Sequence, residues 1–69
     1  MRYFSYVEYD EKDGFVVTMS EEEILNTYWW YWYDRMCAKF GKEHVDVTYT
    51  KEDALTDWIV VNWAWEVDE

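Results

Sequence analysis

The sequence predicts an α+β fold in which one long helix packs across an antiparallel sheet of three to four strands. Two short runs of alternating apolar and polar residues begin the chain. A long segment with a capping signal and helical periodicity follows them, and two further alternating runs come after a glycine. These observations predict the order β-β-α-β-short α-β. The length is that of one domain, which we expect to span residues 1–69.

The first two strands are expected to form a hairpin. In Arg2–Tyr9 the side chains alternate between the two faces of a strand, and Phe15–Met19 is rich in β-branched residues. The segment between them, Asp10–Gly14, is polar and ends in a glycine that can adopt positive φ. The two strands are therefore predicted to pair antiparallel across a short loop.

The start of the long helix carries the sharpest local signal in the chain. Ser20 can accept a hydrogen bond from the third helical residue, Glu23, whose side chain can reach back in return. Met19 and Ile24 occupy the positions of a hydrophobic staple. Three consecutive glutamates also suit the positive end of the helix dipole. We therefore predict that the helix begins directly after Ser20.

The same helix is predicted to run over about Glu21–Phe40, because Gly41 can take the conformation that commonly follows a helix. One stripe of the helix is apolar and forms the expected core face: Leu25, Tyr28, Trp29, Trp32, Met36 and Phe40. Trp30 and Tyr31 fall away from this stripe. We expect their aromatic side chains to be exposed.

The second half of the chain is predicted to hold two more strands with a short helix between them. His44–Tyr49 alternates in polarity as a strand does. Thr50 can cap a short helix that ends near Asp57. Trp58–Val67 alternates again and is predicted to be a long strand, whose core face consists of Ile59, Val61, Trp63, Trp65 and Val67.

The charge balance limits the classes of partner. Sixteen Asp and Glu residues against six Lys and Arg give a formal net charge of −10, while 23% of the residues are aromatic. The apolar surface suffices for folding, so the acids should form a negative exterior. Such a surface repels nucleic acid and anionic membranes, and the longest apolar run, Tyr28–Tyr33, is too short to span a bilayer. We therefore expect a basic protein as the partner, with no direct nucleic-acid or membrane binding.

Residues for catalysis are scarce. The chain has one histidine, His44, and one cysteine, Cys37, whereas a zinc site needs about four nitrogen or sulfur ligands. Asp10–Gly14 lacks the ligand spacing of a calcium loop. We predict no catalytic residue, no metal site and no cofactor, and hence no enzyme. The single thiol and the lack of a signal peptide indicate a cytoplasmic location.

Two sets of residues are candidates for binding a partner. The first consists of acidic clusters: Asp10, Glu11 and Asp13 in the hairpin loop, Glu21 and Glu22 at the helix start, and Glu52, Asp53 and Asp57 in the short helix. A further acidic group lies near the C-terminus: Glu66, Asp68 and Glu69. The second set is the pair Trp30 and Tyr31, because exposed aromatics mark interfaces.

The whole profile resembles the small acidic proteins that bacteriophages make to disable host enzymes. The resemblance rests on size, charge and the acidic and aromatic stretch Asp57–Glu66. It implies a DNA-mimic-like, anti-defence inhibitor that binds a basic, nucleic-acid-binding enzyme in the host cytoplasm. One alternative is a structural or adaptor protein that forms a homodimer through its exposed aromatics. A small enzyme is the third possibility.

Overall fold

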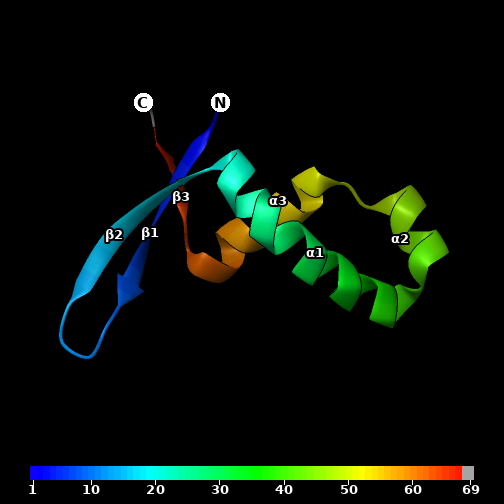
Figure 1. Ribbon diagram of the computed structural model, residues 1–69, viewed down its shortest axis with the longest axis horizontal. Helices are drawn as coiled ribbons and strands as arrows, with labels where there is room; N and C mark the ends of the chain where they lie inside the picture. Colours follow the sequence, from blue (N-terminus) through cyan, green and yellow to red (C-terminus); the bar gives the residue numbers. More distant parts are fainter. Residues whose placement is uncertain (68–69) are drawn as a thin grey trace.

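The computed structural model describes residues 1–67, in which an antiparallel sheet lies at one end of a group of helices (Figure 1). The elements in chain order are β1 (Tyr3–Tyr9), β2 (Gly14–Ser20), α1 (Glu21–Phe40), α2 (Lys42–Thr48), α3 (Lys51–Asn62) and β3 (Trp65–Val67). The predicted α+β class, with an antiparallel sheet and one long helix, is confirmed.

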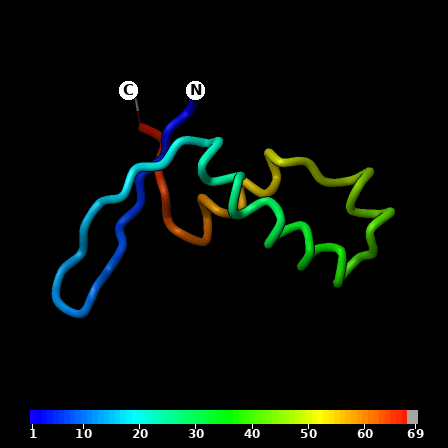
Figure 2. The backbone as a smooth tube through the Cα atoms, in the orientation of Figure 1, coloured from blue at the N-terminus to red at the C-terminus, as the bar shows by residue number. Residues whose placement is uncertain are grey.

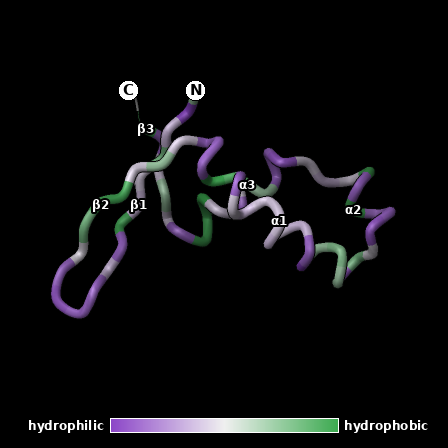
Figure 3. Tube along the Cα trace, viewed as in Figure 1, coloured by the Kyte–Doolittle hydropathy of each residue, from purple (hydrophilic) through white to green (hydrophobic). Residues whose placement is uncertain are grey.

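β1 and β2 form the predicted hairpin and pair along their whole length. The Asp10 carboxylate closes the turn by accepting hydrogen bonds from the backbone N–H groups of Lys12 and Asp13, each at 2.9 Å. The far half of the hairpin projects away from the helices (Figure 1, Figure 2), and its turn is strongly hydrophilic (Figure 3). The hairpin is therefore a two-stranded arm with a polar tip.

β3 lies on the other side of β1, which gives the strand order β2-β1-β3. It is short and pairs only with Tyr3–Ser5. Within residues 1–67, the second half of β1 therefore has a neighbouring strand on one side alone.

The start of α1 has the predicted capping box. The Glu23 N–H donates to the Ser20 hydroxyl at 3.2 Å, and the Ser20 N–H donates to the Glu23 carboxylate at 3.1 Å. At the other end, Gly41 has a φ of 88° and its N–H donates to the Cys37 carbonyl. Both predicted ends of this helix are confirmed.

The main core lies where β1, α1 and α3 meet. Phe4, Ile24, Leu55 and Trp58 are buried together there. The ring of Trp58 also meets Tyr6 edge-on, with the two centroids 5.4 Å apart. Since Phe4 and Tyr6 lie on the same face of β1, the helices pack against that face of the sheet.

The predicted core stripe of α1 is right in part. Trp32 is buried, and four members of the stripe are partly buried: Leu25, Tyr28, Trp29 and Met36. Phe40 is 51% exposed, because the core ends before the last turn of the helix. Ile24, expected only as a staple residue, is fully buried.

The strand predicted at His44–Tyr49 is wrong, because this segment belongs to α2 and its C-cap. Polarity that alternates over a few residues also fits a short helix, where residues two apart lie about 200° apart around the axis. Val45 is buried while Val47 is 85% exposed, as that helical geometry requires. Lys42 and Asp46, one turn apart, form an ion pair at 2.5 Å.

The long strand predicted at Trp58–Val67 is also largely wrong. α3 continues past Asp57 to Asn62, and only Trp65–Val67 is extended. The helical phase places Ala54, Leu55 and Trp58 in the core, and this packing outweighs the β propensity of the residues that follow. Most of the predicted core face is consequently exposed: Val61, Trp63 and Trp65. The predicted cap at Thr50 is confirmed, since its N–H donates to Asp53 at 2.7 Å.

Loss of the capping hydroxyl should destabilise the protein. Ser20→Ala removes the acceptor for the Glu23 N–H and should lower the free energy of unfolding by about 0.5–2 kcal/mol, measured by urea denaturation. The control is Thr56→Ala, which deletes an exposed hydroxyl inside α3 and should change stability by less than about 0.5 kcal/mol. Equal effects of the two substitutions would contradict a special role for the box.

Candidate partner-binding surfaces

Arg2 holds two of the predicted binding acids together. Its guanidinium lies 2.5 Å from the Glu21 carboxylate and 2.7 Å from that of Glu52. These contacts join the start of β1 to the first turns of α1 and α3. The hydrogen bond from Arg2 lowers the pKa of Glu52, and both carboxylates raise the pKa of Arg2. Glu21 and Glu52 are therefore part of an internal clamp, which we call the Arg2 clamp.

The other two acids predicted in the short helix also make internal contacts. Asp53 accepts hydrogen bonds at the N-cap of α3. Asp57 accepts a 2.5 Å hydrogen bond from the Tyr28 hydroxyl on α1. Burial, together with this hydrogen bond, raises the pKa of Tyr28. The cluster of Glu52, Asp53 and Asp57 thus holds α3 in place and is less available to a partner.

Among the predicted binding acids of the loop and helices, those that remain available lie in the hairpin loop and at the start of α1. Glu11, Asp13 and Glu22 are exposed, and their carboxylates make no hydrogen bond or ion pair within residues 1–67. Asp10 is also exposed, and the N–H groups of Asp13 and then Lys12 lower the pKa of its carboxyl. These carboxylates lie near the two ends of β2.

The acids near the C-terminus are only partly visible. Glu66 is exposed on β3, whereas Asp68 and Glu69 lie outside the described residues. Within residues 1–67, Glu66 is therefore the one member of this acidic group.

The predicted exposure of two α1 aromatics is confirmed. Trp30 is 64% exposed and Tyr31 is 54% exposed. The Arg35 guanidinium lies 5.4 Å from the centre of the Tyr31 ring and donates to its hydroxyl at 3.1 Å. Trp30 meets Tyr33 edge-on at 6.1 Å. Trp30 is the better anchor of the pair, because Tyr31 is already covered in part by Arg35.

A groove that sequence reasoning missed lies between the end of β1 and the end of α3. It has a volume of about 360 Å³ and is lined by Val7, Tyr9, Asn62 and Trp63. Trp63 is 87% exposed and adopts a left-handed backbone with a φ of 55°, which is rare for a bulky residue. The groove exists because β3 starts only at Trp65 and leaves the neighbouring part of β1 uncovered. Assignment of Trp58–Val67 to a buried strand hid this groove.

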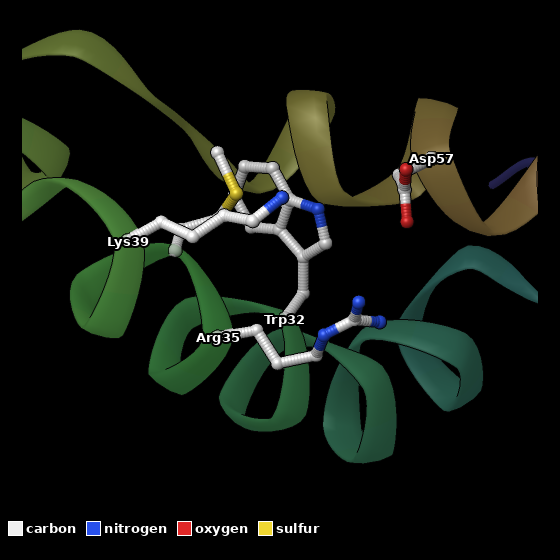
Figure 4. Close-up of a pocket in the computed structure, with 5 residues that line it drawn as sticks. Trp32, Arg35, Lys39 and Asp57 are labelled. Atoms are coloured by element: carbon white, nitrogen blue, oxygen red, sulfur yellow. The ribbon is translucent and has the colours of Figure 1, made fainter.

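A second, smaller hollow of about 120 Å³ lies between α1 and α3 and is lined by Trp32, Arg35, Met36, Lys39 and Asp57. In Figure 4 the Lys39 side chain extends across the Trp32 ring, while Arg35 extends below the ring toward the side on which Asp57 lies, on α3. Neither cation forms an ion pair within the described part of the chain. This hollow interrupts the acidic exterior, and its volume is below that of a typical small-molecule site.

The residues considered for catalysis are not brought together. His44 packs against the rings of Phe40 and Tyr49, and no contact joins it to Cys37 within residues 1–67. Across the same residues, no three His, Cys, Asp or Glu side chains are grouped so that they could hold a metal ion. None of the helices formed there has the length and apolarity needed to cross a membrane.

In comparisons with protein-family models, curated proteins and solved structures, no match was found.

Replacement of Arg2 should remove the clamp and its pH dependence. Because Arg2 lowers the pKa of Glu52 in the folded state, the clamp stabilises above the usual value of 4.5 and fades as the pH falls through the lowered value. Arg2→Gln should therefore lower the urea midpoint near neutral pH. The difference from wild type should shrink as the pH falls through the lowered pKa of Glu52, because that carboxylate then becomes protonated.

The control for this experiment is Arg35→Gln, which makes the same change in net charge but involves no carboxylate partner. If the two variants lose equal stability, or if the effect of Arg2→Gln is independent of pH, the ionic role of Arg2 is contradicted.

Substitution of Trp30 should leave the fold intact, because its side chain is largely exposed. We expect Trp30→Glu to keep the circular dichroism spectrum of the wild type. Its free energy of unfolding, from urea denaturation, should stay within about 0.5 kcal/mol of the wild-type value. If the protein self-associates through this side chain, sedimentation analysis should show monomers for Trp30→Glu and dimers for the wild type. Monomeric wild-type protein would contradict the homodimer.

Proposed function

We propose that this chain is a non-enzymatic, protein-binding inhibitor or modulator that occupies a basic, nucleic-acid-binding surface of a partner enzyme. The observation that carries the proposal is the projecting hairpin with two exposed carboxylates at its tip, Glu11 and Asp13, that make no hydrogen bond or ion pair within residues 1–67. In a complex, these carboxylates take the positions of phosphates and meet Lys and Arg side chains. The net charge of −10 steers the chain toward such a surface.

The internal contacts rank the candidate acids. Glu52, Asp53 and Asp57 already accept hydrogen bonds within the chain, so recruiting them requires breaking those contacts. Glu11 and Asp13 require no such change. The hairpin tip is therefore the first acidic element to meet the partner, and the acids of α3 are secondary.

Exposed aromatics supply the apolar part of the interface in this proposal. Trp30 and Trp63 are 64% and 87% exposed, and tryptophan is among the residues enriched at binding hot spots. The partner is a protein in the cytoplasm of the host cell. Neither nucleic acid nor a membrane is bound directly, since both would be repelled by the same charge.

A second candidate function is a self-associating structural or adaptor protein. The exposure of Trp30 favours it, because a second copy of α1 could cover this side chain. The net charge counts against this arrangement, because two copies that each carry a net charge of −10 repel one another.

The test of the proposed function is a competition titration of the captured partner. The partner is isolated by pull-down and identified by mass spectrometry, and the complex is then titrated with duplex and single-stranded nucleic acid. Binding should weaken as salt rises above about 0.1 M, where the screening length is about 10 Å. Added nucleic acid should also displace the chain from the partner. A complex that survives both high salt and excess nucleic acid would refute the proposal.

A pair of matched variants locates the contact. Glu11→Gln with Asp13→Asn should weaken binding about tenfold, since each lost exposed charge pair contributes up to about 1 kcal/mol. Asp34→Asn with Glu43→Gln makes the same charge change on exposed acids of α1 and α2 and should have little effect. Equal effects of the two pairs would show that only overall charge matters, which contradicts a contact at the hairpin tip.

A further inference from the structure

The outer edge of β2 is a strand edge without a partner. The strand order places β2 at the border of the sheet, and nothing pairs with its outer side within residues 1–67. The strand Gly14–Ser20 contains no charged residue and no proline. Proteins usually protect such edges with charges, prolines or bulges, because an open edge is a template for another strand. β2 has no such protection within the strand itself.

Two hydrogen bonds reveal which backbone groups face outward. The Asp10 N–H donates to the Asp13 carbonyl at one end of the hairpin, and the Glu21 N–H donates to the Arg2 carbonyl at the other. Residues opposite each other in an antiparallel pair alternate between hydrogen-bonded and non-hydrogen-bonded pairs. The register between these two ends therefore assigns every residue of β2 to one side.

By this alternation, three residues of β2 direct their N–H and C=O groups toward β1: Phe15, Val17 and Met19. The residues between them direct these groups to the open edge: Gly14, Val16, Thr18 and Ser20. The N–H of Ser20 is already bound to Glu23. Gly14, Val16 and Thr18 thus offer a regular set of donors and acceptors.

Acidic residues flank this edge at both ends. Before β2 come the hairpin-loop acids Asp10, Glu11 and Asp13, which outnumber Lys12 in the same loop. After β2 comes the exposed Glu22, between Glu21 and Glu23, whose carboxylates are bound to Arg2 and Ser20. The strand of seven residues between them spans about 23 Å. A complementary ligand is therefore an extended segment with an uncharged centre and a basic residue near each end.

We propose that the open edge of β2 binds such a basic-flanked, extended segment of the partner protein, which adds to the sheet as a fourth strand. This inference takes one assumption from the proposed function, namely that the partner is basic. Backbone hydrogen bonds to Gly14, Val16 and Thr18 provide the affinity, as in other cases of strand addition. Val16 and Phe15, on opposite faces, are 60% and 49% exposed and contact the incoming side chains.

Charge disfavours a second copy of this chain as the occupant. If two β2 edges paired antiparallel, the hairpin-loop acids of each copy would lie beside Glu21–Glu23 of the other. If they paired parallel, identical acidic clusters would lie side by side. Both arrangements place like charges together, whereas a basic-flanked segment places opposite charges at both ends.

The experiment uses a fluorescent, acetylated and amidated peptide of sequence KRTVTVTRK as the probe. Binding is measured by fluorescence anisotropy at low salt, and amide hydrogen exchange is followed by NMR. The peptide should slow exchange at Gly14, Val16 and Thr18, while the inward amides of β2 are already slow in the free protein. The charge-reversed peptide EETVTVTEE should not bind. Protection elsewhere than the β2 edge would overturn the proposal.

A substitution at the edge provides the second test. Val16→Pro removes an outward N–H and leaves the hydrogen bonds to β1 in place, as edge positions tolerate. It should weaken peptide binding by about tenfold or more, while the control Val16→Thr keeps the N–H and should bind like the wild type. Equal binding by the two variants would overturn the proposal. If the protein without peptide is a dimer, and the outward amides of β2 already exchange slowly in it, a second copy occupies the edge and the proposal is overturned.

The two proposals fail in different ways. If the peptide protects the β2 edge but nucleic acid does not displace the partner, the proposed function fails and the edge site stands. If nucleic acid displaces the partner, and Val16→Pro captures that partner as well as Val16→Thr does, the edge site fails and the proposed function stands.

Discussion

The contact of Phe4 on β1 and Trp58 on α3 with Ile24 on α1 holds the sheet and the two longest helices together. These three side chains lie in one buried cluster. In a chain of 69 residues this cluster is the main core, so it determines which segments pack together. The Arg2 clamp lies at the start of the same three elements and adds charge pairs to the apolar contact.

The core also determines which charges are available for binding. It brings the starts of α1 and α3 together, and the acids there find partners within the chain: Glu21 and Glu52 on Arg2, Asp53 at its own cap and Asp57 on Tyr28. The hairpin projects beyond the core, so Glu11 and Asp13 find none within residues 1–67. The proposed function follows from this division between acids that stabilise the fold and acids that do not.

Within residues 1–67, the projecting half of the hairpin is open on both edges. On one side β3 is too short to reach Val7 and Tyr9, and the groove around Trp63 lies next to them. On the other side β2 lies at the border of the sheet, and no strand pairs with its outer edge. The helices cover only the part of the sheet near Phe4 and Tyr6. Apolar side chains, unpaired backbone groups and available carboxylates therefore occur on one arm of the molecule.

Local sequence patterns were enough to predict the α+β class, the hairpin and both ends of α1. These features depend on neighbouring residues, such as the Asp10 turn, the Ser20–Glu23 box and Gly41, whose hydrogen bonds or backbone preferences act locally. The exposure of Trp30 and Tyr31 also followed from the helical phase of α1. The helical state of His44–Thr48 and Trp58–Asn62 depends on tertiary packing, because a short alternating run suits either a strand or a helix until other residues cover one side of it. Burial of Val45 and Trp58 favours the helical state of these two segments. The helical state of α3 in turn leaves Trp63 exposed and brings Glu52 and Asp57 to Arg2 and Tyr28.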